Sequence, residues 1–192
     1  MFDVLYLNKQ QDLETYKNII STSFSDSAYN TVEYFDVFCG GIDDLVCLVF
    51  KKDKKTIILP GYIKNINIHD EDTGFKDFST PYGYTGSYCS TSVNVSDLEE
   101  FWNNVKNWLS DNNIVSAFVR FNLFDNYIGF NGQIHNTMLN IKGEIIDKET
   151  QWNNFEHKVR KNVKKAIREN LTSKIYYKNI DDDVIESFHE VY

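Results

Sequence analysis

The feature that most restricts the fold is an amphipathic helix that leads directly into an apolar strand, over residues 96–121. Large apolar residues recur at three- and four-residue intervals, which is the spacing of one helix face. They are Leu98, Phe101, Trp102, Val105, Trp108 and Leu109. Ser96 precedes them and Glu99 follows three residues later, so we expect Ser96 to be the N-cap of this helix. The apolar stretch IVSAFVRF at 114–121 then predicts a buried strand, and the two elements together indicate an α/β unit.

The patterns before this unit predict a mixed α/β fold. Strands are expected at 2–7 and in a hairpin over 44–66 whose strands are joined at KKDKK. Helices are expected at about 11–22 and before Gly40, and HDEDTG at 69–74 is expected to be a polar turn. Hairpin-like strands favour an α/β fold with a mixed (α+β) sheet over a doubly wound nucleotide fold. The phosphate-binding patterns GxGxxG and GxxxxGK[ST] are also absent.

After this unit, the patterns predict further short elements. A strand is expected at 137–141, a long helix at about 148–170 and another strand at 173–180. From residue 181 an amphipathic helix begins shortly before the sequence stops, which predicts a boundary made by truncation. We therefore expect one domain over residues 1–146 and the start of a second over residues 147–192.

Composition excludes several classes of protein. With 42% apolar residues, the 192-residue chain can bury a core. It has no apolar run long enough to cross a bilayer and no signal peptide, so we expect a cytoplasmic protein without a membrane span. Cys39, Cys47 and Cys89 have neither disulfide-framework nor zinc-ligand spacing, and no metal site is expected.

Charge is distributed unevenly along the chain. The net charge is −8, but HKVRKNVKKAIR at 157–168 carries +6, which leaves −14 on the rest. The acidic surface argues against DNA binding. On a helix, the cations of this stretch form a ridge that suits phosphates, with Arg160, Lys161 and Lys164 among them. The alternative is a solvated helix face beside an acidic body.

A loop rich in aromatic residues, FKDFSTPYGYTGSYCS at 75–90, is the second candidate site. Its glycines and proline permit tight turns, so Tyr82, Tyr84 and Tyr88 could point into a cleft and stack on a ligand. The alternative is a packed surface loop. Arg120, at the end of the predicted strand, is expected either to pair with an acid or to bind a ligand.

Other patterns do not indicate covalent catalysis. The histidines show no ligand spacing and are expected on the surface; they are His69, His135, His157 and His189. GxSxG is absent, and no local signature activates a cysteine. An enzyme of this sequence would bring two substrates together and stabilise developing charge with fixed donors.

Three stretches, in order over residues 75–175, resemble FemAB-like proteins of the GNAT superfamily. DFSTPYGYTGSY resembles a PYGYGG-type loop, SAFVRFNLFDN a strand that ends in arginine, and WNNFEHKVRKNVKKAIRENL a basic helix. The family includes aminoacyl transferases that build peptidoglycan bridges. The resemblance implies paired GNAT-like domains and direct transfer of an aminoacyl or acyl group to an amine, without an enzyme-bound intermediate.

The resemblance also implies substrates and site residues. The donor would be aminoacyl-tRNA or acyl-CoA, with no tightly bound cofactor, and the acceptor a muramyl-peptide precursor, with the protein peripheral to a lipid-linked form. The residues expected to bind substrate are Tyr82, Tyr84, Arg120, Arg160, Lys161 and Lys164. Alternative hypotheses are a non-catalytic module that binds RNA or a nucleotide sugar, and a structural domain with a partner-binding surface.

Overall fold

The structure is a computed structural model. It describes residues 1–24, 28–90, 93–123, 126–137, 139, 143–176 and 180–191. The chain divides into two compact units, residues 1–140 and residues 141–192, with a boundary slightly before the one expected from the sequence. The acids and bases of the second unit balance, so the first unit carries the whole net charge of −8.

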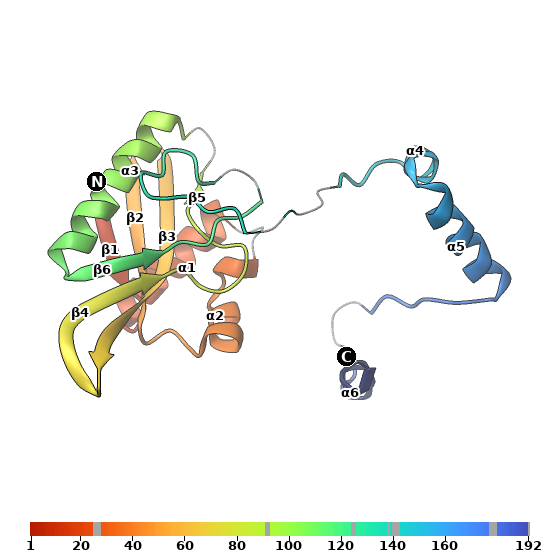
Figure 1. Ribbon diagram of the computed structural model, residues 1–192, viewed down its shortest axis with the longest axis horizontal. Coiled ribbons are helices and arrows are strands. Elements are labelled where there is room, and N and C mark those ends of the chain that lie inside the picture. The colour runs from red at the N-terminus through yellow and green to blue at the C-terminus, as the bar shows by residue number, and fades with distance from the viewer. Residues whose placement is uncertain are drawn as a thin grey trace. The chain divides into compact units, whose positions relative to one another are not determined.

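A six-stranded mixed sheet forms the centre of the first unit, which confirms the expected α/β class (Figure 1). Its strands are β1 (Phe2–Tyr6), β2 (Leu45–Lys52), β3 (Lys55–Ile68), β4 (Glu71–Ser79), β5 (Tyr88–Cys89) and β6 (Ile114–Phe118). The order is β1-β2-β3-β4-β6, and the short β5 pairs with β3. Strands β1 to β4 pair antiparallel, whereas β6 pairs parallel with β4.

Helices cover both faces of this sheet. They are α1 (Gln10–Ser23), the short 3-10 helix η1 (Ala28–Asn30), α2 (Val32–Cys39) and α3 (Val95–Asp111). One apolar cluster joins α1 and α2 to the sheet, and a second joins α3 to the sheet. Strand β2 contributes alternate residues to the two clusters, for example Cys47 to the first and Leu48 to the second. Because both faces are buried, β2 is a continuous apolar run instead of an alternating one.

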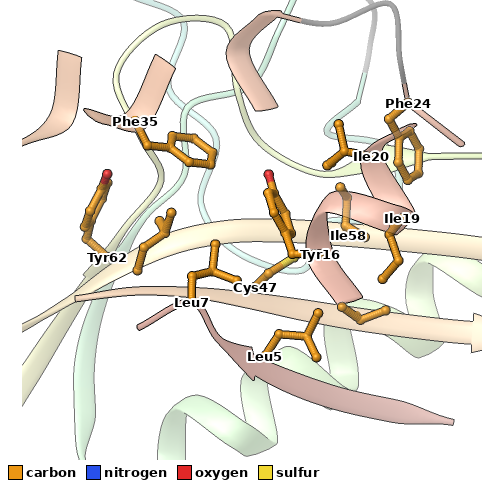
Figure 2. Close-up of a cluster of buried hydrophobic side chains, with 12 residues drawn as sticks. Leu5, Leu7, Tyr16, Ile19, Ile20, Phe24, Phe35, Cys47, Ile58 and Tyr62 are labelled. Atoms are coloured by element: carbon orange, nitrogen blue, oxygen red, sulfur yellow. The ribbon is translucent and has the colours of Figure 1, made fainter. Parts of the chain in front are cut away.

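The cluster under α1 and α2 consists of buried apolar and aromatic side chains together with Cys47. Figure 2 shows the ring of Phe35 of α2 pointing toward Tyr16 of α1, and the two ring centroids are 6.2 Å apart. The Tyr16 hydroxyl donates a 2.6 Å hydrogen bond to the backbone oxygen of Asn30. Burial raises the pKa of both Tyr16 and the Cys47 thiol. Cys47 and Cys89 are free thiols, and Cys47 is a core residue because its side chain is fully buried in this cluster.

The first hairpin confirms the sequence pattern, and the second extends it. Lys52 pairs with Lys55 across the β2–β3 turn, inside the expected KKDKK connection. In the β3–β4 connection only His69 and Asp70 form the turn, with positive φ angles of 51° and 65°. The expected polar turn over 69–74 is therefore too long, because residues from Glu71 onward belong to β4. Much of β4 is polar and exposed, so backbone pairing with β3 holds it in place and no apolar pattern indicated it.

Helix α3 and strand β6 form the expected α/β unit with two corrections. The N-cap is Asn94, whose side chain accepts from the Asp97 backbone N–H at 2.9 Å, and Ser96 lies inside the helix. The Asp97 carboxylate accepts in turn from the Asn94 backbone N–H. The capping box therefore has the expected spacing but starts two residues earlier. Strand β6 is largely exposed: Val115 and Phe118 are 61% and 59% exposed. The buried strand expected over 114–121 is thus a short edge strand.

The second unit contains α4 (Lys148–Asn154), α5 (His157–Arg168) and α6 (Asp182–Val191). The single helix expected over 148–170 is wrong, because Phe155 and Glu156 adopt extended angles between α4 and α5. Residues 173–176 form no strand, although a strand was expected over 173–180. The strand expected at 137–141 falls mostly outside the described residues, whereas α6 confirms the C-terminal helix. In the part of the chain that is described, no helix has the length and apolarity needed to cross a membrane.

Candidate functional site

A cleft of about 890 Å³ opens in the first unit between α3, β6 and the segment that follows β6. Trp102 and Val105 of α3 and Phe78 of β4 give it an apolar floor. The rings of Phe121 and Phe130 pack edge to face 5.1 Å apart, and Phe130 meets Trp102 in the same way at 4.8 Å. This is the concave, mostly apolar form that small-molecule sites take.

Arg120 follows β6 and lines this cleft, half-buried. Its Nη1 donates a 2.5 Å hydrogen bond to the Thr80 backbone oxygen, and its backbone N–H donates to Thr80 Oγ1 at 2.9 Å. The guanidinium carbon also lies 4.6 Å from the centroid of the Phe118 ring. Within the described residues, no carboxylate forms an ion pair with Arg120. In the described part of the chain, the Arg120 guanidinium thus contacts a backbone oxygen and an aromatic ring instead of a carboxylate.

The charges on the cleft wall have one sign. Lys106 of α3 and His135 line the cleft along with Arg120. No Asp or Glu is among the described residues that line it. Acids outnumber bases in this unit, so a wall without carboxylates is a local exception that favours an anionic ligand.

The aromatic loop is held against the cleft by Asn126. The Asn126 side chain donates to the backbone oxygens of Thr85 and Ser87, each at 3.0 Å, and accepts from the Asn122 backbone N–H at 2.8 Å. The Ser87 hydroxyl donates in return to the Asn126 backbone oxygen at 3.0 Å. Thr85 and Ser87 are buried, so these bonds satisfy groups that water cannot reach. The loop is therefore fixed to the segment after β6 by several bonds at once.

Two glycines of the aromatic loop allow close contacts, Gly86 with the segment after β6 and Gly83 with Tyr29 and Tyr34. Gly86 has φ +96°, and a Cβ there would lie 2.8 Å from Asn126 Nδ2 and 2.9 Å from the Arg120 backbone oxygen. Gly83 has φ +100°, and a Cβ there would meet the Tyr29 ring and the Tyr34 hydroxyl. Both positions need glycine for its backbone angle and its lack of a side chain.

The three tyrosines of the loop have different environments. Tyr84 lines the cleft, 43% exposed, with its ring edge to face with Tyr29 at 5.9 Å. Tyr82 is 69% exposed and does not line the cleft, and its backbone oxygen accepts from the Tyr34 hydroxyl at 2.9 Å. Tyr88 donates to the Tyr84 backbone oxygen at 3.0 Å and packs against Phe24, so it supports the loop. Only Tyr84 is placed to contact a ligand in the cleft.

Arg160, Lys161 and Lys164 belong to α5 in the second unit and form a group of their own. Arg160 is half-buried and its Nη1 donates to the Asn153 backbone oxygen at 3.4 Å, whereas Lys161 and Lys164 are exposed. Among the described residues, the one ion pair on α5 joins Lys165 to Glu169 at 3.8 Å. The ridge is thus a largely unpaired set of cations.

Sequence reasoning missed three residues of the site. Lys106 follows Trp102 by one helical turn, and this spacing could have placed both on the same side of α3. His135 was expected on the surface; it is exposed and also lines the cleft. Asn126 had no sequence signal, because its role depends on contacts with a loop about 40 residues away, such as the Asn126–Thr85 bond across 41 positions. The described His, Cys, Asp and Glu residues include no group of three that could hold a metal.

Comparisons with known protein families, with curated proteins and with solved structures find no match to this chain. The functional argument therefore rests on the cleft and the basic helix.

Proposed function

We propose that the protein is an N-acyltransferase of FemAB-like type whose cleft in the first unit holds an anionic substrate. The observation that carries this proposal is Arg120, which is half-buried on a cleft wall whose described residues include no carboxylate and is oriented by Thr80 and Phe118. The order of the three sequence stretches and the mixed sheet support the type of protein.

The proposed substrates suit such a site. Aminoacyl-tRNA, acyl-CoA and muramyl-peptide precursors all carry phosphates, and arginine binds phosphate oxygens in a bidentate manner. In the reaction, the acceptor amine attacks the acyl carbonyl, a C–N bond forms, and the tRNA hydroxyl or the CoA thiol leaves. Fixed cations nearby stabilise the negative charge that develops on the carbonyl oxygen.

Individual residues take separate roles in this proposal. Arg120 and Lys106 bind the anionic group, the Tyr84 ring packs on the substrate body, and the His135 imidazole accepts the proton released by the amine. Tyr82 lies on the exposed side of the same loop, where an extended acceptor peptide would pass. On α5, we assign phosphate contacts to a group consisting of Arg160, Lys161 and Lys164.

The test measures binding and turnover with three probes: a muramyl-pentapeptide nucleotide precursor, acetyl-CoA and aminoacyl-tRNA. We expect Arg120→Gln to weaken binding of one of them by about 10- to 100-fold, the loss typical of one charged hydrogen bond. Lys64→Gln, an exposed lysine of β3, is the control and should leave binding unchanged. If the Arg120→Gln protein remains folded and binds all three probes as the parent does, the cleft is not the substrate site.

A second function is favoured by one observation, the absence of Asp and Glu from the described cleft wall. Many proton transfers in enzymes use a carboxylate, so its absence suits a module that binds RNA or a nucleotide sugar without chemistry. Salt-sensitive binding without transfer of an acyl group from any donor would support this second function. Turnover that falls in His135→Asn with little change in KM would support the transferase.

A further inference from the structure

Helix α5 has two chemically distinct sides. At about 100° per residue, its six cations cover one side of the helix, and Val159, Val163 and Ala166 lie on the opposite side. Ile167 borders this apolar side, and Lys158 and Arg160 lie at the two edges of the basic side. This helix is strongly amphipathic, has low net hydrophobicity and is rich in lysine. These properties are typical of helices that lie in the plane of a membrane surface.

Two aromatic residues, Trp152 and Phe155, lie just before α5 in the chain. Trp152 and Phe155 pack edge to face 6.3 Å apart at the end of α4, and the Arg160 side chain bonds back to the Asn153 backbone oxygen across the junction. No described side chain of α4 or α5 is buried. Phe155, Val159 and Ile167 are 37%, 39% and 67% exposed. Apolar and aromatic side chains thus lie on the surface beside a row of lysines.

We propose that α5 lies in the plane of an anionic lipid bilayer, with its apolar side among the acyl chains and its cations on the headgroup phosphates. Charge complementarity selects this partner, because α5 itself holds six cations and no acid. An RNA backbone would also match the cations, but it would leave the valines, Ile167 and Phe155 in water. The lipid surface uses both sides of the helix. The lipid proposal needs neither the cleft nor a donor, but it uses the same α5 cations, Arg160, Lys161 and Lys164, to which the acyltransferase proposal assigns substrate phosphates. Vesicle binding measured without any substrate therefore tests the lipid surface alone.

The first test is co-sedimentation of the full chain with vesicles of phosphatidylcholine alone and of phosphatidylcholine with phosphatidylglycerol. We expect binding only to the anionic vesicles, weakened by salt. The triple variant Lys158→Gln, Lys161→Gln, Lys165→Gln should lose about 100-fold in partitioning, at about fivefold per cation. The matched control removes three exposed lysines of the first unit, Lys17→Gln, Lys51→Gln and Lys64→Gln, and should bind as the parent does.

The second test separates a lipid surface from nucleic acid. Val159→Gln with Ile167→Gln keeps good helix formers and all six cations but removes apolar side chains. This variant should lose at least about tenfold in vesicle binding, and a blue shift of Trp152 fluorescence, isolated by comparison with Trp152→Phe, should disappear with it. The proposal is overturned if the double glutamine variant binds vesicles as the parent does. It is also overturned if the parent binds a single-stranded RNA but no anionic vesicle, or binds neither.

Discussion

Asp97 joins helix capping to charge pairing at a single buried residue. Its carboxylate is 3% exposed, forms an ion pair with Lys55 at 2.5 Å and another with Lys52 at 3.2 Å, and also accepts from the Asn94 backbone N–H. These bonds, with Lys55 the largest contributor, lower the Asp97 pKa from 3.8 to about 2. A buried charge paired and capped in this way ties the start of α3 to the β2–β3 hairpin.

The first prediction concerns the pH dependence of stability. Because folding lowers the pKa of Asp97, its contribution is fully present above pH 3.8 and is lost as pH falls toward about 2. We expect the free energy of unfolding, measured with urea between pH 5 and pH 2, to fall more steeply in the parent than in Asp97→Asn. Glu99→Gln, an exposed acid of the same helix, should follow the parent curve. Parallel curves for parent and Asp97→Asn would refute this role.

The second prediction concerns Gly86. Alanine there would strain a backbone with φ +96° and press its Cβ against Asn126 and the Arg120 carbonyl, so we expect a loss of about 3 kcal/mol in stability. Gly74 is a matched control: its φ is +72°, but a Cβ there meets no atom within 4 Å. Gly74→Ala should lower the free energy of unfolding by only about 1 kcal/mol, because alanine there is disfavoured only by the positive φ angle. If urea unfolding gives equal losses of stability for Gly86→Ala and Gly74→Ala, the close contact between Gly86 and the segment after β6 does not contribute.

At the level of elements, α3 and β6 contribute unequally to the core. Helix α3 buries Phe101, Trp102 and Val105 against the sheet, and β6 pairs along β4 at the edge of the sheet. A parallel pair needs a crossover, and α3 lies between β4 and β6 in the chain. The cleft lies where this crossover returns to the sheet, so α3 supplies part of its floor and the segment just after β6 supplies Arg120.

The third prediction compares two valines of this unit. Val105 of α3 is 3% exposed and Val115 of β6 is 61% exposed. We expect Val115→Lys to change the free energy of unfolding by no more than about 0.5 kcal/mol, as for most surface changes. Val105→Lys would bury an unpaired charge and should cost about 4 kcal/mol or more. Thermal unfolding followed by circular dichroism distinguishes the two, and a large loss in Val115→Lys would mean that β6 is covered in solution.

At the level of the whole molecule, all residues of the two apolar clusters lie before residue 141. The described helices of the second unit have no buried residue. Hydrophobic burial is the main driving force of folding, so the first unit contains the stabilising core of the described chain.

The fourth prediction follows from this division. A fragment of residues 1–140 should fold alone and unfold cooperatively, with a thermal midpoint within a few degrees of the full chain, roughly the effect of less than 1 kcal/mol. Circular dichroism and differential scanning calorimetry measure both properties. A fragment that is unfolded, or that melts far below the full chain, would show that residues after 140 stabilise the core.

Local patterns in the sequence were sufficient for elements whose period is set by their own residues. The 3.6-residue period of α3, the apolar runs of the β2–β3 hairpin and the amphipathic end at α6 all predicted their elements. The same patterns failed where two local structures, such as two possible N-caps, are both compatible with the same few residues. The capping box moved from Ser96 to Asn94, because Asp97 can there also reach two lysines, and the basic helix was interrupted at Phe155.

By itself, the sequence determined the α/β class, the main helices and hairpin, and the concentration of positive charge on one helix. Only the tertiary structure decided that polar β4 is a strand, that β6 is an exposed edge, and that Tyr84, Lys106, Arg120 and His135 line one cleft. The physical reason is the separation along the chain of the residues that interact. Periodicity and capping depend on neighbours within a few residues, whereas strand pairing and the Asn126 bonds to the aromatic loop depend on contacts between distant parts of the chain.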